Sequence, residues 1–198
     1  MDYNYIFFDC ETNSGRSHAD ILTISALFVD KDFKLIEEFN CAARLRKSRI
    51  YEIDSFLVNG MDPFEVDKHP FSNFDLTKKA NDKFISWINK GPVLFCAHNG
   101  YQFDYMLTST HLFTNLFTWP WIFSTGNAKQ IDSLPILQNF DFYAPNTIAV
   151  ELNEKSNKTF KLGSLCRMNG FDLGDKAHTA EADTLGMNKL MELINKKN

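Results

Sequence analysis

Residues 5–12 read YIFFDCET, a short apolar run that ends in two acidic residues, Asp9 and Glu11. The length and composition of this run predict a buried strand. Because side chains alternate along a strand, both carboxylates leave from one face, while Cys10 points to the other. Two anions on one face repel each other, and a divalent cation such as Mg²⁺ or Mn²⁺, which prefers oxygen ligands, removes that conflict. The plain alternative is an exposed strand end with two solvated acids.

The segments that follow extend this strand into a sheet. Residues 21–29 (ILTISALFV) are rich in β-branched side chains, and residues 34–39 follow the turn signal Asp30-Lys31-Asp32. The opening of the chain therefore predicts an antiparallel meander of three strands.

Beyond the meander, helical and strand patterns alternate. Residues 75–89 carry apolar side chains at helical spacing, and residues 92–97 (PVLFCA) form a buried run that Asn99-Gly100 ends. This order predicts an α/β fold with a mixed five-stranded sheet, whose first three strands are antiparallel and whose faces carry helices. The remaining predicted elements are a helix over 103–112, a short strand near Ile122, a helix over 131–140 and a closing helix over 179–196.

The composition narrows the class of protein. The length of 198 residues and a hydrophobic content of 44% predict a single domain over residues 1–198. A net charge of −4 argues against a protein that binds nucleic acid by bulk positive charge. It leaves room for an enzyme that meets phosphate through metal ions, because carboxylates gathered around cations add to the acidic count.

Compartment and redox state follow from what the sequence lacks. No secretory signal is visible at the N-terminus, and no apolar run approaches the roughly 20 residues of a membrane helix. None of the four cysteines forms a CxxC pair, so we expect buried, reduced thiols and a cytoplasmic protein without membrane contact. The four are Cys10, Cys41, Cys96 and Cys166.

A third acidic residue, Asp104, follows the predicted strand over 92–97 and falls in the first turn of the next helix. The carboxyl ends of strands in α/β sheets are where ligands gather. An acid in a first helical turn is also favoured by the helix dipole alone. Asp104 by itself therefore leaves a functional and a structural interpretation open.

The last motif is His178-Thr179-Ala180-Glu181-Ala182-Asp183, at the start of the closing helix. Five residues of α-helix rotate by about 140°, so a helical His178 would not share a face with Asp183. His178 must lie on the loop before the helix if both residues serve one site. A lone histidine is otherwise a surface or core residue.

Taken together in this order, the motifs resemble the DEDDh exonucleases of the DnaQ-like group, which have an RNase H-like fold. The resemblance extends over about residues 5–195 and is strongest to the catalytic domain of bacterial exonuclease I. The matching pieces are Phe8-Asp9-Cys10-Glu11-Thr12, residues 97–104 and residues 178–184, with looser support from residues 59–63, 99–105 and 160–170.

The resemblance implies a 3′-to-5′ exonuclease that releases nucleoside 5′-monophosphates, with single-stranded DNA as the favoured substrate. It also implies two Mg²⁺ or Mn²⁺ ions, with Asp9 as the bridging ligand and Glu11, Asp104 and Asp183 as the others. His178 is then the general base, since its ordinary pKa of about 6.5 suits a base near neutral pH.

Four further residues are expected near the substrate. Thr12 is placed to contact the last nucleotide, and Asn99 either positions the strand or simply closes a turn. Met61 and Phe103 are candidates for an apolar wedge against the terminal bases, with core packing as the alternative for each.

Other interpretations stay open at this point. The basic residues Arg44, Arg46, Lys47 and Arg49, and separately Lys161, either guide a phosphate backbone or belong to solvated loops. The substrate is alternatively RNA or a primer terminus, as in a polymerase-proofreading subunit. A remote alternative is a nucleic-acid-binding module without activity.

Overall fold

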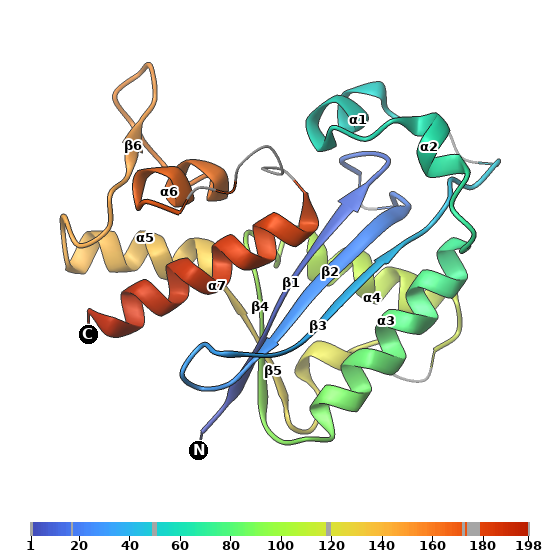
Figure 1. Ribbon diagram of the computed structural model, residues 1–198, viewed down its shortest axis with the longest axis horizontal. Helices are drawn as coiled ribbons and strands as arrows, with labels where there is room; N and C mark the ends of the chain where they lie inside the picture. The colour runs from blue at the N-terminus through green and yellow to red at the C-terminus, as the bar shows by residue number, and fades with distance from the viewer. Residues whose placement is uncertain are drawn as a thin grey trace.

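The structure is a computed structural model that describes residues 2–16, 18–48, 51–117, 120–171, 173 and 179–197. Its centre is a mixed five-stranded sheet with the order β3-β2-β1-β4-β5 (Figure 1). β1 pairs antiparallel with β2 and parallel with β4, and β2 pairs antiparallel with β3. The predicted α/β fold with three antiparallel opening strands is therefore confirmed. The strands are β1 (Asn4–Thr12), β2 (Ile21–Val29), β3 (Leu35–Ala42), β4 (Val93–Ala97) and β5 (Ala128–Asp132).

Helices cover both faces of this sheet. In Figure 1, α7 crosses one face beside α5 and α6, whereas α3 and α4 lie on the other side. The short helices α1 and α2 lie above the ends of β1 and β2, and the hairpin β6–β7 projects away from the sheet. The helices are α1 (Ile53–Asn59), α2 (Pro63–Asp67), α3 (Asn73–Ile88), α4 (Asp104–Thr114), the 3₁₀ helix η1 (Ile122–Ser124), α5 (Ser133–Tyr143), α6 (Leu162–Met168) and α7 (Ala180–Lys196), and the hairpin strands are Glu151–Leu152 and Lys158–Thr159.

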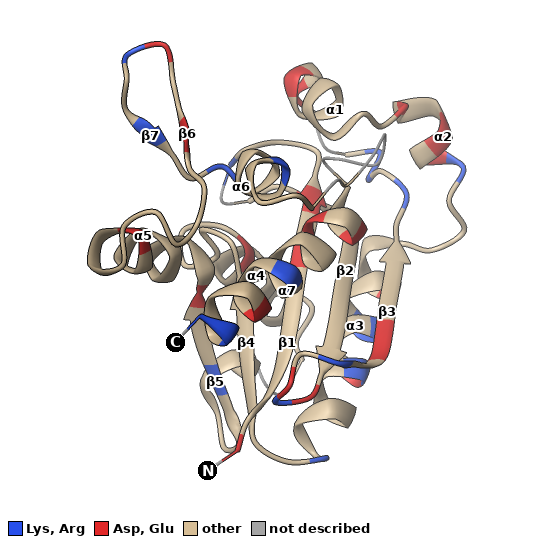
Figure 2. Ribbon diagram, turned by 60° about the vertical axis from the view of Figure 1, so that its left-hand side comes forward, with Lys and Arg blue, Asp and Glu red and all other residues tan. Residues whose placement is uncertain are grey.

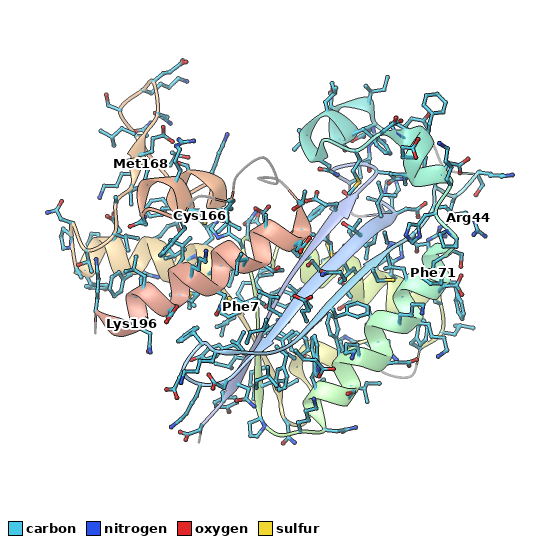
Figure 3. All side chains as sticks on the ribbon, viewed as in Figure 1. Phe7, Arg44, Phe71, Cys166, Met168 and Lys196 are labelled. Carbon is cyan, nitrogen blue, oxygen red and sulfur yellow. The ribbon has the colours of Figure 1, made fainter. Side chains whose placement is uncertain are left out.

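Two neighbouring phenylalanines of β1 explain why the sheet has two hydrophobic layers. Phe8 is fully buried and meets Phe84 of α3 and Tyr105 of α4, with ring centroids 5.9 and 5.2 Å away. Phe7 is also fully buried but belongs to the cluster under α5, α6 and α7, and Figure 3 shows it on β1 beside α7. Because strand side chains alternate, Asp9 and Glu11 leave β1 on the same side as Phe7.

A glycine allows α7 to pack closely against α6. A Cβ atom at Gly186 would lie 2.6 Å from the Sγ atom of Cys166, which is far closer than real contacts allow. Cys166 is a buried residue of α6 (Figure 3). This close contact helps to fix where along β1 the first turn of α7 lies.

Two of the predicted elements were wrong in position. The strand expected near Ile122 is the 3₁₀ helix η1, and the strand itself lies at β5, so the helix expected over 131–140 begins only at Ser133. β5 is an edge strand of sequence AKQID, and its mostly polar residues hide it from a search for apolar runs.

The cysteines and the helices bear on two expectations that were drawn from the composition. The cysteines are free thiols, and Cys10, Cys96 and Cys166 are buried as expected, while Cys41 is only half-buried. Within the described ranges, none of the helices combines the length and the apolar character that crossing a bilayer requires.

Candidate active site

Three carboxylates converge where β1 meets the first turn of α7. One ligand oxygen each from Asp9, Glu11 and Asp183 lies within 4.8 Å of the other two. α7 packs across β1 and β2, which carries Asp183 over the strand end. Figure 2 shows acidic residues gathered at this junction. The structure therefore brings together three of the residues that the sequence singled out.

The start of α7 is fixed by a helix cap. The Thr179 hydroxyl accepts a hydrogen bond from the Ala182 N–H at 3.2 Å, and the Thr179 carbonyl accepts one from the Asp183 N–H at 2.9 Å. Threonine is among the favoured N-cap residues, and acids in the first turn are stabilised by the helix dipole. Both effects hold the Asp183 backbone in the turn that faces β1.

Asp104 approaches the same strand end from α4. Its carboxylate is 3% exposed and accepts a hydrogen bond from the Cys10 N–H at 3.1 Å. Cys10 lies between Asp9 and Glu11 in the chain, so the fourth carboxylate adjoins the other three. The path into α4 is tight, because a Cβ atom at Gly100 would lie 2.4 Å from the Cβ atom of Ala97.

The electrostatics of this cluster are unfavourable without a cation. Burial, followed by the charges of Asp104, Glu11 and Asp183, raises the pKa of Asp9 well above its ordinary value. Burial and the charge of Asp183 raise the pKa of Glu11 to about 8. Burial raises the pKa of Asp104 to about 7, although its hydrogen bond from Cys10 acts in the opposite direction.

The donor set fits hard divalent cations. Carboxylate oxygens are the ligands that Mg²⁺ and Mn²⁺ prefer. In the part of the chain that the structure describes, no Lys or Arg forms an ion pair with Asp9, Glu11 or Asp104. A bound cation would favour the charged form of each carboxylate and so reverse the direction of the three pKa shifts.

Thr12 and Asn99 make internal contacts. The buried Thr12 hydroxyl donates to the Ser14 carbonyl at 2.7 Å, so it is already engaged within the chain. Asn99 has a positive φ of 60°, and its N–H donates to Asp132 Oδ1 at 2.8 Å. These contacts favour the interpretation in which Asn99 closes the turn after β4.

Met61 and Phe103 differ in their surroundings. Met61 is half-buried and lines a pocket of about 390 Å³ together with Thr179 and Glu181 of the α7 start and residues of β2 and β3. Phe103 is partly buried and packs against the hydrophobic cluster that contains Phe8. The pocket therefore keeps Met61 as a candidate for substrate contact, while Phe103 has a packing role in this structure.

His178, the expected general base, lies outside the described residues, and so does Arg49 of the basic cluster. Two other members of that cluster bind the protein itself. The Arg44 guanidinium donates to the Pro70 carbonyl at 2.7 Å, beside Phe71 in Figure 3, and Arg46 Nε lies 3.0 Å from Asp20 Oδ1. Lys47 and Lys161 are exposed.

Asp132 is a contributor that the sequence did not single out. Its carboxylate accepts hydrogen bonds from the N–H groups of Asn99, Tyr101 and Leu134, at 2.8, 3.1 and 3.0 Å. It thereby caps α5 and fixes the turn that leads to Asp104. An aspartate followed closely by Pro135 is a recognisable signal of a helix start, and it was obscured by the helix predicted from 131.

Comparison with known proteins identifies similar chains. No family model matches the sequence. The chain is 25% identical over 201 residues to exodeoxyribonuclease I of Buchnera aphidicola subsp. Schizaphis graminum, a match that covers 99% of this chain and 40% of the relative. The chain thus spans about two-fifths of the length of that protein.

Solved structures share the fold. Escherichia coli exonuclease I in complex with a dA16 oligonucleotide superimposes with a TM-score of 0.90 at 18% identity, over 99% of this chain and 41% of that one. A zinc-bound form of the E. coli exonuclease I–single-stranded DNA complex gives a TM-score of 0.86 at 18% identity, over 100% and 41% of the two chains. By its fold and by a distant sequence match over nearly its whole length, the chain is a homologue of the DnaQ-like catalytic domain of exonuclease I.

Proposed function

We propose that this chain is a metal-dependent 3′-to-5′ exonuclease acting on single-stranded DNA. The observation that carries the proposal is the convergence of acidic side chains near the end of β1, where one ligand oxygen each from Asp9, Glu11 and Asp183 lies within 4.8 Å of the other two. Asp104 adjoins them through the Cys10 N–H. Repulsion among these carboxylates and their partial burial do not stabilise the fold. Both are features of a site that binds divalent cations.

Asp9, Glu11, Asp104 and Asp183 are the residues that would hold two divalent cations. Two divalent cations, when bound, supply charge stabilisation for the attacking and leaving oxygens of an in-line phosphodiester displacement. His178 is assigned to accept the proton of the attacking water, as the family resemblance implies.

Two observations favour DNA as the substrate. The relative from Buchnera is named an exodeoxyribonuclease, and the E. coli structures hold dA16 or other single-stranded DNA.

The pocket beside Met61 opens next to the start of α7, where the last nucleotide of a strand would be received. A half-buried thioether offers an apolar surface against a base without selecting its identity.

Labelled oligonucleotides test this proposal. A single-stranded DNA labelled at its 5′ end should shorten one nucleotide at a time in Mg²⁺, and the same DNA labelled at its 3′ end should release labelled mononucleotide at once. EDTA should stop both reactions, and Mg²⁺ or Mn²⁺ should restore them. Internal fragments, or digestion that continues in EDTA, would contradict the proposal, and a matched RNA strand would reveal an exoribonuclease instead.

A further inference from the structure

The chain just after Glu11 is held by an unusual number of polar contacts. The pairing of β1 with β2 shifts register between Glu11 and Thr12, and the strand then leaves the sheet. The returning chain is closed by two hydrogen bonds: the Asn13 N–H donates to the Asp20 carbonyl at 3.2 Å, and the Asp20 N–H donates to Asn13 Oδ1 at 2.9 Å. The position of Asp20 therefore fixes the position of the strand end.

Asp20 is buried and lies in charge contact with the partly exposed Arg46. Its residue is 2% exposed, and Arg46 Nε lies 3.0 Å from its Oδ1 atom. The same guanidinium donates to Asn73 Oδ1 at 3.0 Å, and the Asn73 Nδ2 atom donates to the Ile21 carbonyl at 2.7 Å. These contacts form a closed circuit from Asp20 through Arg46 and Asn73 to Ile21, the residue next to Asp20.

Two contacts from α1 complete the support. Asn59 Nδ2 donates to the Thr12 carbonyl at 3.0 Å, and the Glu52 N–H donates to the Asn13 carbonyl at 2.9 Å. The two residues that follow Glu11 are therefore held directly from α1 and, through Asp20, from the loop at Arg46 and from α3. Few segments outside the sheet need such support unless their position matters.

Stability alone is a poor explanation for the charged pair. Removing a carboxylate from water is costly, and well-packed apolar residues often replace a buried ion pair without loss of stability. An apolar pair, however, fixes neither direction nor distance. The Arg46 guanidinium is directed by its hydrogen bond to Asn73, and this places its Nε in charge contact with Asp20, whose carboxylate accepts no hydrogen bond from it.

We infer that the Asp20–Arg46 pair is a positioning device for the acidic end of β1. It holds the backbone of Thr12 and Asn13, and through that backbone it sets where the Glu11 carboxylate meets Asp9 and Asp183. The inference rests on the proposed function. Asp20 and Arg46 act on the acidic cluster through the backbone at Thr12 and Asn13, so they are positioning residues.

The test replaces the pair by apolar residues of similar size, Asp20→Leu with Arg46→Met, so that no buried charge is left without a partner. Mn²⁺ binding is measured by calorimetry without substrate, and kcat and KM are measured on a single-stranded DNA. The affinity for Mn²⁺ and kcat should each fall about 10- to 100-fold, as when outer partners of metal ligands are removed. KM for the DNA should change less than about twofold, because the strand-contacting surface is left in place.

Two single variants sharpen the result. Arg46→Lys keeps the charge but loses the planar fork that also reaches Asn73, so it should recover only part of the Mn²⁺ affinity. Arg16→Ala is the matched control: it removes an exposed ion pair on the same loop, Arg16 Nε to Glu52 Oε1 at 2.7 Å, and should leave the Mn²⁺ affinity unchanged.

A folded double variant with wild-type Mn²⁺ affinity and wild-type kcat would overturn the inference and leave the pair a purely structural contact. Should the double variant fail to fold, Asp20→Asn takes its place, since it removes the charge of the pair and keeps the shape of the side chain. Unchanged Mn²⁺ affinity in that variant also overturns the inference. If the wild-type chain itself neither binds Mn²⁺ nor degrades DNA, the proposed function fails, which is a separate result.

Discussion

Asp9 occupies a costly position for a charge. It is surrounded by Glu11, Asp104 and Asp183, and burial adds to their repulsion in raising its pKa. Glu11 and Asp104 share that environment, with pKa values of about 8 and 7. At neutral pH the bare cluster therefore retains protons, which a divalent cation would replace.

Asp9→Asn should separate stability from activity. The substitution removes a carboxyl whose ionisation the fold opposes, so the metal-free protein should become more stable at neutral pH, by about 2–4 °C in Tm for each kcal/mol gained at this chain length. Exonuclease activity should fall by roughly 10³-fold or more, because several kcal/mol of charge stabilisation depend on the lost ligand. Thermal unfolding in EDTA and turnover in Mg²⁺ measure the two effects, and a wild-type turnover rate would remove Asp9 from the mechanism.

The metal-free protein should lose stability as pH rises. The pKa values of Glu11 and Asp104 are raised on folding, so the folded state binds more protons than the unfolded state between about pH 4 and 8. Stability from these groups is complete below their unfolded pKa values and is lost as pH rises through the folded ones. Thermal unfolding in EDTA at pH 5, 6.5 and 8 measures this decline.

Mn²⁺ should raise Tm far more at pH 8 than at pH 5, because cations compete with fewer protons there. Glu11→Gln is the control and should flatten the decline in EDTA. A metal-free Tm that is independent of pH over this range would contradict the assigned electrostatics.

His178→Ala tests the proposed base. The variant should still bind Mn²⁺, since the four carboxylates remain, while its turnover falls by about 10²- to 10⁴-fold, the usual contribution of a general base. The limb of the pH–rate profile that reflects deprotonation of the base should also disappear. A profile of unchanged shape in the variant would exclude His178 from that role.

At the scale of elements, the first turn of α7 decides whether Asp183 reaches β1. The turn begins at Thr179, whose hydroxyl and carbonyl accept from Ala182 and Asp183. Further along the helix, Gly186 lets α7 approach Cys166 of α6. The carboxylate of Asp183 thus depends on one cap and one close helix contact.

Thr179→Ala should loosen this turn. Loss of an N-cap side chain costs about 1 kcal/mol of stability, and the first turn should fray, so that Mn²⁺ affinity falls as well. Urea unfolding and calorimetry measure the two changes. Thr179→Ser keeps the accepting oxygen and should behave as wild type, and equal Mn²⁺ affinity in the alanine variant would show that the cap does not position Asp183.

The elements that the sequence predicted well are those with long, regular patterns. Burial of one face makes apolar residues recur at every turn of a helix or at every second residue of a strand. This explains the period of α3, the apolar run of β4 and the alternation along β1. β5 has no such pattern, because an edge strand with mostly polar residues buries few apolar side chains. Helices α1, α2 and α6 have five to seven residues each, too few for a period to emerge.

On the scale of the whole molecule, the site lies where two packing layers meet. Phe7 and Phe8 point into separate hydrophobic clusters, and the strand that carries both ends at Asp9 and Glu11. Sequence spacing placed these two acids on one face, but it could not place Asp104 and Asp183 beside them, because long-range convergence leaves no local pattern. The family resemblance supplied that grouping, and neither spacing nor resemblance indicated the support from Asp20, Arg46 and Asp132.

Anomalous diffraction from crystals soaked in Mn²⁺ and a nucleoside 5′-monophosphate tests the two-metal site most directly. We expect two peaks about 3.5–4 Å apart, with the Asp9 carboxylate between them, Glu11 and Asp183 at one and Asp104 near the other. A single peak, or peaks away from these four carboxylates, would contradict the account.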